Sequence, residues 1–183
     1  EVTAIWIKKK LTLNGSVFHN FTTQLIERVT KFENNVTITT PYNVGSNAST
    51  GIEANAKYRL SKKVTLTSDA NFNYFNKKGQ FETQVFDFEG QRWSSRLTGK
   101  FKLPKKFDLE LTGRYSSGFE TFQGQVSGFA HMDMGIRKKM LENKLVINFG
   151  VRDVFASRIQ ENIVEQVDFY NYSFRQRGRF ITL

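Results

Sequence analysis

The sequence lacks cysteine and contains little proline or histidine. Its 183 residues include no cysteine, two prolines and two histidines, His19 and His131. The absence of cysteine excludes disulfide scaffolds, thiolate zinc sites and cysteine nucleophiles. Two histidines leave little room for a histidine-based metal cage. We therefore expect neither a metal nor another cofactor.

Long apolar runs are also missing. A membrane-spanning helix needs about 20 consecutive apolar residues, whereas the longest runs here are short, as at Ala4-Ile5-Trp6-Ile7. The sequence therefore predicts no membrane helix. Its first residues also lack the basic and then apolar pattern of a secretory leader. We expect that a leader was removed or that the chain is a fragment.

What the sequence does contain is alternation of polar and apolar residues. Eighteen phenylalanines and an aromatic content of 14% argue against disorder, although the mean hydropathy is −0.45. From Gly51 to Leu60 the even positions are Ile52, Ala54, Ala56, Tyr58 and Leu60, and polar residues fill odd positions from Glu53 to Arg59. A period of two predicts a β-strand with two unlike faces. The same pattern recurs over residues 11–21, 64–74, 92–103, 107–115, 130–137 and 145–152. We also predict strands at 25–32 and 174–183, where the alternation is poor.

The connections between these strands alternate in length. Tight basic turns are predicted at residues 7–10, 60–63, 103–106 and 141–144, and long polar linkers at about 33–50, 76–91, 116–128 and 155–173. An up-and-down antiparallel sheet produces this alternation if all tight turns lie at one end and all long loops at the other.

The alternation leaves open which face of the sheet is covered. Strands of about 10–13 residues suit a tilted membrane span, which needs about 9–11. Aromatic residues near the long loops are typical of a belt at the membrane surface; they are Tyr74, Phe75, Trp93, Tyr115 and Phe129. These features favour an all-β transmembrane barrel with an apolar outer face and a polar lumen. The alternative is a soluble or surface-attached β-barrel or sandwich that turns its apolar face inward and binds a ligand or protein through its long loops.

Several motifs together carry a resemblance to a known family. They are "KFKLPKKFDLEL" at 100–111, "GFAHMDMGIRKKMLENKLVINFGVRDVFASR" at 128–158, "TGIEANAKYRLSKKVTL" at 50–66 and "RFITL" at 179–183. In order and spacing, the sequence resembles the outer-membrane β-barrel family of Bacteroidota, the barrels of TonB-dependent receptors. The resemblance covers nearly the whole chain.

The resemblance implies a 22-stranded barrel, a plug domain that fills its lumen and a segment that contacts the energy-coupling protein TonB. Against that pattern, residues 1–183 hold about nine or ten strand candidates and no plug or coupling segment. We therefore expect the C-terminal part of a receptor barrel in the outer membrane of a Gram-negative bacterium. The expected function is import of a nutrient, namely a small molecule, glycan or peptide. The expected partners are outer-membrane lipid, the plug domain and TonB.

Two sets of residues are candidates for contacts with cargo. The first consists of charged residues expected to face the lumen, where they could select a polar cargo or hold a plug: Glu53, Asp69, Arg96, Lys100, Glu110, Arg114, Asp133 and Arg137. The second consists of aromatic residues in the long loops: Phe81, Phe86, Phe88, Phe119, Phe122, Tyr170 and Tyr172. Loops on a rigid scaffold are where binding residues usually lie.

Two other functions are weighed and set aside. His131, Asp133 and Arg137 share a strand face and are the most enzyme-like group, but no motif places a nucleophile or second acid beside them. We expect a hydrogen-bonded pair there and no enzyme. The net charge of +10 could suit nucleic acid. Because many of the lysines lie in the turns and no nucleic-acid motif is present, we expect no nucleic-acid partner.

Overall fold

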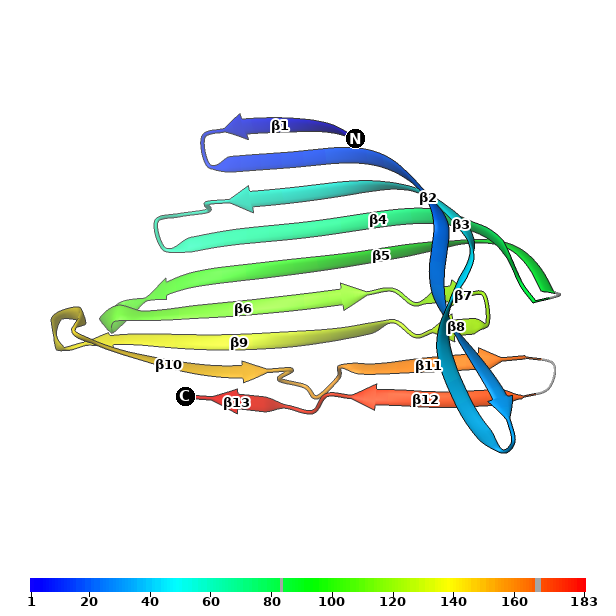
Figure 1. Ribbon diagram of the computed structural model, residues 1–183. Helices are drawn as coiled ribbons and strands as arrows, with labels where there is room; N and C mark the ends of the chain where they lie inside the picture. The colour runs from blue at the N-terminus through cyan, green and yellow to red at the C-terminus, as the bar shows by residue number, and fades with distance from the viewer. Residues whose placement is uncertain (83, 167–168) are drawn as a thin grey trace.

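The computed structural model describes residues 1–82, 84–166 and 169–183, and these residues form two antiparallel sheets (Figure 1). Residues 83 and 167–168, which fall in two of the predicted loops, lie outside the described residues. The larger sheet has the order β1-β2-β3-β4-β5-β6-β9-β10-β13, and the smaller has the order β12-β11-β8-β7. The described residues form thirteen strands, nine of them in the larger sheet, against the predicted nine or ten; the strands predicted at 11–21 and 25–32 are one continuous strand.

The larger sheet is a meander, since almost every strand pairs with its neighbours in sequence. It comprises β1 (Val2–Lys8), β2 (Leu11–Glu33), β3 (Val36–Tyr58), β4 (Val64–Phe81), β5 (Gln84–Leu103), β6 (Phe107–Ser116), β9 (Phe129–Met140), β10 (Leu145–Arg152) and β13 (Phe180–Thr182). Tight turns join the strands at one end, two of them as short 3-10 turns, η1 (Pro104–Lys106) and η2 (Leu141–Asn143). Figure 1 shows these turns on the left, as predicted, and most of the other connections on the right.

Two of the predicted linkers are strands instead of loops. Residues 36–50 form the first half of β3, and most of residues 76–91 extend β4 and β5. At about 3.3 Å per residue, a 23-residue strand such as β2 is about 76 Å long. The hydrocarbon core of a bilayer is about 30 Å thick, so these strands extend well beyond it. The predicted strand length of 10–13 residues was wrong for β2 to β5.

The other two long connections form the smaller sheet. Residues 116–128 fold into the hairpin of β7 (Phe119–Thr121) and β8 (Gly124–Val126). Strands β11 (Ile159–Glu165) and β12 (Tyr170–Gln176) pair with each other, and β8 pairs with β11. The predicted strand at 174–183 is therefore the end of β12 and the separate strand β13.

The β2–β3 hairpin bends and crosses the smaller sheet (Figure 1). The bend coincides with register shifts between Thr22 and Ile26, where Gln24 has a φ of 55°. Extra residues of this kind bend a strand. Opposite the bulge, Gly45 lies so close to β4 that a Cβ would be 2.1 Å from the Lys78 carbonyl oxygen, so only glycine fits. We call residues 25–45 the arm.

We use two further names for the parts of the molecule. The wall is the larger sheet between its tight turns and the level of Trp93 and Tyr115. The mouth comprises the arm, the extensions of β4 and β5 at residues 75–91, and the smaller sheet.

The wall is a single layer with almost no apolar core. Its apolar side chains stay exposed; for example, Leu97 keeps 57% and Ile52 keeps 54% of its surface. Among the described residues, four apolar side chains are buried: Val29, Phe75, Val151 and Val164. A soluble domain of this length would bury most of its apolar residues. The dry interior that the soluble alternative requires is therefore absent from the described part of the chain.

The aromatic belt is correct in part. Tyr74, Trp93 and Tyr115 lie on the apolar face of the wall, and the rings of Trp93 and Tyr115 are 4.6 Å apart. Phe75 and Phe129 lie on the opposite face: Phe75 packs against Gly90, and Phe129 shares its face with His131. Including these two in the belt was wrong, because their positions alternate with the apolar ones and so point to the polar face.

Candidate functional site

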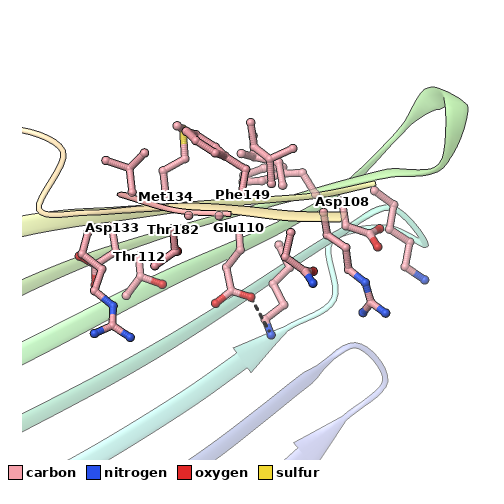
Figure 2. A pocket seen from close by; sticks show the side chains of 18 of the residues that line it. Asp108, Glu110, Thr112, Asp133, Met134, Phe149 and Thr182 are labelled. Carbon is pink, nitrogen blue, oxygen red and sulfur yellow. Dashed lines mark ion pairs between the residues drawn. The ribbon is translucent and has the colours of Figure 1, made fainter. Parts of the chain in front are cut away.

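All eight charged residues predicted to face the lumen lie on one face of the wall. Strand pairing puts Asp69 opposite Arg96, Arg96 opposite Arg114, and Lys100 opposite Glu110, and the remaining members share their parity. Figure 2 shows Glu110, Thr112 and Asp133 projecting from one side of the sheet, and Met134 and Phe149 from the other. The other strands of the curved sheet lie on the side of the charged groups. That this face lines a closed lumen stays a prediction.

Near the tight turns, charges of opposite sign alternate from strand to strand. Asp108 lies between Lys102 and Arg137, and Lys100 forms an ion pair of 3.0 Å with Glu110 (Figure 2). These groups line a trough of about 630 Å³ together with Arg152 and Thr182. Asp108 and Glu110 each have a basic neighbour, and Arg152 adds a further positive charge to the trough.

A row of threonines crosses the face above these ion pairs. Thr67, Thr98 and Thr112 lie opposite one another, and the hydroxyls of Thr98 and Thr112 are 3.1 Å apart. Thr112 is buried and lies opposite Asp133. The row separates these charges from a second charged group nearer the mouth.

The charged row nearer the mouth is arranged differently. It runs Asp69, Arg96, Arg114 and His131, so that two arginines are direct neighbours. Arg114 Nε is 3.9 Å from Asp133 Oδ2, while Arg96 makes no ion pair with any described residue. The row lines a hollow of about 410 Å³ that also includes Glu53, Phe129 and Arg158.

A fixed turn after β10 brings Arg158 to this hollow. Asp153 is 3% exposed, and its carboxylate accepts hydrogen bonds from the backbone N–H groups of Ser157 at 2.9 Å and Arg158 at 3.0 Å. The Asp153 N–H in turn donates to Asp133 Oδ1 at 2.9 Å. The turn places the Arg158 guanidinium 5.6 Å from the centre of the Phe129 ring. The "DxF" motif thus ends in a structural turn that positions an arginine.

His131 and Asp133 are close but not hydrogen-bonded. His131 Nε2 is 4.0 Å from Asp133 Oδ2, and Asp133 Oδ1 is already used by Asp153. The imidazole is 8% exposed, stacks on Phe129 at 5.9 Å, and its Nδ1 has no hydrogen-bond partner in the described chain. The predicted hydrogen bond between the two side chains is therefore not formed. That the protein is not an enzyme stays a prediction.

The seven loop aromatics do not form one site. Phe86 lies 5.3 Å from Phe122 and 6.1 Å from Phe88, so these three join β5 to the β7–β8 turn. Phe81 packs on Tyr42 at 4.9 Å, with the Lys31 ammonium 4.9 Å above its ring. The other three lie apart. The Arg92 guanidinium lies over the Phe119 ring, the Tyr172 hydroxyl donates a hydrogen bond to Glu161, and Tyr170 is exposed on β12. Their contact with cargo stays a prediction.

Gln123 is a functional position that the sequence analysis missed. It is 7% exposed at the β7–β8 turn, and its side-chain amide pairs with the Thr30 backbone: it accepts from the N–H at 2.8 Å and donates to the carbonyl at 2.9 Å. A further contact brings the rings of Phe32 and Phe169 within 6.4 Å. These contacts hold the arm across the mouth. No sequence pattern links two positions 93 residues apart.

Phe129 and Arg158 were also missed as members of the site. A signal for Phe129 was available, since it is two residues before His131 and so on the same strand face. Arg158 follows the "DxF" motif, and only the folded turn shows where its side chain lies.

The described residues contain neither a membrane helix nor a candidate metal site. No helix there is long and apolar enough to cross a membrane. Over the same residues, no group of three or more histidines, cysteines or acids could hold a metal ion.

A curved antiparallel sheet with one exposed apolar face and one charged face defines the wall of an outer-membrane barrel. The particular family follows from comparison with known proteins: the profile of the outer membrane protein beta-barrel family matches residues 1–183. The chain therefore belongs to this family, which indicates a location in the outer membrane of Gram-negative bacteria. No curated protein and no solved structure matches the chain.

Proposed function

We propose that the chain forms part of the barrel of a TonB-dependent receptor that imports a nutrient, in a member of the Bacteroidota. The observation that carries the proposal is the continuous charged face, which runs from the tight turns to a mouth built of long strands and loops. A pore for polar solutes needs such a face, because a solute gives up water on leaving bulk solvent and needs replacement partners. The motif resemblance supports the receptor class.

Under this proposal, each part of the molecule has a task in import. The apolar face contacts outer-membrane lipid. The mouth captures a small molecule, glycan or peptide, and the arm and the smaller sheet hold the loops in place through the Gln123 contact with Thr30. A plug domain closes the lumen, and TonB supplies the energy to move it. The charged face then offers polar contacts along the path.

The test is energy-dependent depletion of a solute. Cells with and without the full-length gene are given four separate limiting nutrients: a ferric siderophore, cobalamin, an oligopeptide mixture and an oligosaccharide mixture. Mass spectrometry measures what disappears from the medium. We expect faster depletion of at least one solute when the gene is present, and loss of that difference when the proton gradient is collapsed or TonB is deleted. A passive pore would continue without either, and equal depletion in all strains would contradict import.

A further inference from the structure

We infer that the row near the mouth binds an anionic group of the imported solute, a carboxylate or a phosphate. The site consists of Arg96, Arg114 and Arg158, with Phe129 as one wall, and we call it the arginine site. The inference rests on the proposed function for the identity of its ligand as cargo, but binding of an anion can be measured without transport.

Two positive charges of the arginine site lie opposite each other on neighbouring strands. Arg96 and Arg114 are directly opposed on neighbouring strands, where Cβ atoms are about 4.5–5.5 Å apart. Like charges at such positions repel each other unless an anion lies between them. Every other pair of charged residues opposed in the pairing of β4, β5, β6 and β9 has opposite signs. The arrangement at Arg96 and Arg114 is therefore an exception on this face.

Two of the three guanidinium groups have no acid within ion-pair distance. Glu53 and Asp69 line the same hollow, and Glu53 accepts a hydrogen bond from the Asn71 amide at 2.9 Å. Asp133 is held by the Asp153 N–H and lies 3.9 Å from Arg114, the one ion pair that the three arginines make with described residues. Within the described chain, Arg96 and Arg158 form no ion pair of 4.0 Å or less.

The hollow has a volume and a lining that suit a small anion. Its volume of about 410 Å³ lies in the range of small-molecule sites, about 300–1,000 Å³. Guanidinium groups bind carboxylate and phosphate through two parallel hydrogen bonds. The side chains of Ser94 and Ser116 line the same hollow and can donate to further oxygens. The Asp153 turn fixes the backbone of Arg158, so one of the three arginines is positioned before a ligand arrives.

The site also lies where an incoming solute would meet it first. Ser117, directly after β6, donates through its backbone N–H to the Trp93 carbonyl at 2.8 Å, and β7 of the smaller sheet begins two residues later at Phe119, so this end of the row adjoins the smaller sheet. A charge at the mouth end of a lumen raises the local concentration of counter-ions and speeds capture.

The test uses the full-length protein, purified from outer membranes in an uncharged detergent at low ionic strength. Isothermal titration calorimetry measures binding of two probes in separate arms, citrate and inorganic phosphate. We expect saturable binding of at least one probe. Binding of citrate alone identifies a carboxylate site, binding of phosphate alone a phosphoryl site, and binding of both a general oxyanion site. If neither binds, the inference is wrong.

Three variants locate the binding. Arg114→Gln should weaken it about 10- to 100-fold, as expected for loss of a charge-assisted pair of hydrogen bonds. Lys62→Gln removes the same charge from an exposed turn at the other end of the wall and should leave affinity unchanged. Asp69→Asn removes the competing acid and should tighten binding. Equal affinities for the Arg114 and Lys62 variants would overturn the assignment, because net charge alone would then explain the binding.

Folding of each variant is checked by the change in gel mobility on heating that barrels show, so that loss of binding is not confused with loss of structure. The depletion experiment separates the two proposals. If energy-dependent uptake occurs but citrate and phosphate do not bind, the arginine site is wrong and the import function stands. If the anions bind but nothing is imported, the site stands and the receptor function is wrong.

Discussion

The wall and the mouth share strands β2 to β5 but are stabilised in different ways. In the wall, apolar side chains such as Leu97 and Ile52 remain exposed, and polar side chains cover the other face. In the mouth, Val29 is 1% exposed, Phe75 is buried against Gly90, and the Gln123 side chain bonds both backbone groups of Thr30. The wall therefore leaves its apolar face uncovered, whereas the mouth has a small core and internal hydrogen bonds like a soluble domain.

The largest expected effect on stability comes from placing one lysine in each region. Leu97 is near the middle of its span on the apolar face, so Leu97→Lys should cost about 2–4 kcal/mol, the cost of a lysine at the bilayer midplane. Val85, also on β5, is 77% exposed in the mouth, and Val85→Lys should cost almost nothing. Asn71→Lys controls for face, because that lysine would lie beside Glu53. Urea unfolding of the full-length protein in lipid vesicles measures all three.

Equal costs for the Leu97 and Val85 variants would mean that lipid does not cover the apolar face. A cost for Asn71→Lys as large as that for Leu97→Lys would mean that the assignment of faces is wrong.

The next effect concerns the contact that holds the arm. Gln123→Ala leaves the Thr30 N–H and carbonyl without their partners, which should cost about 1–3 kcal/mol. Because the contact is local, we expect faster hydrogen exchange of the arm amides and unchanged exchange in β6 and β9. Gln125→Ala, at an exposed position two residues away on β8, is the matched control. Unchanged exchange at Thr30 would show that other contacts hold the arm.

Two ion pairs sharpen the comparison between the regions. In the wall, Lys100 pairs with Glu110, and both side chains are at least half exposed. In the mouth, Lys77 pairs with Glu27, and both side chains are less than a third exposed. Double-mutant cycles with glutamine should give a coupling energy of about 0.2–1 kcal/mol for the exposed pair and about 1.5–3 kcal/mol for the mouth pair. Adding 0.5 M NaCl should reduce the first more than the second. The reverse order would mean that burial does not set these energies.

The same difference decides how much the sequence could predict. In the wall, one apolar face and one polar face keep the alternation regular, so the strands and the shared face of the eight charged residues followed from parity. Alternation also continues through Val36-Thr37-Ile38-Thr39 and Val85 to Glu89, within the two segments predicted to be linkers. The Asn34-Asn35 pair, with φ of 49° and 64°, was an available hairpin signal.

Other features of the mouth carry no local signal. The pairing of β8 with β11, the Gln123 contact with Thr30 and the position of Arg158 over Phe129 join segments that are 29 to 93 residues apart in sequence. Single residues make these contacts, and no repeating pattern accompanies them. Long-range packing of this kind is fixed only when the whole chain folds.

The smallest effect is a pH dependence confined to the mouth. Asp87 accepts hydrogen bonds from Lys78 at 2.9 Å and from the Asn76 amide at 3.2 Å, and these lower the pKa of its carboxyl below the ordinary value. A carboxyl with a lowered pKa in the folded state stabilises the fold above its unfolded pKa of about 3.9 and stops doing so as pH falls through the folded value. The β4–β5 extension should therefore open more often at lower pH.

Pepsin, which is active in acid, can measure that opening as a cleavage rate. Above pH 4 the wild type should be cleaved more slowly than Asp87→Asn, and the two rates should converge as pH falls. Asp108→Asn, at the turn end of the wall, should leave this difference intact. A rate ratio that is constant with pH would show that the Asp87 charge does not hold the extension.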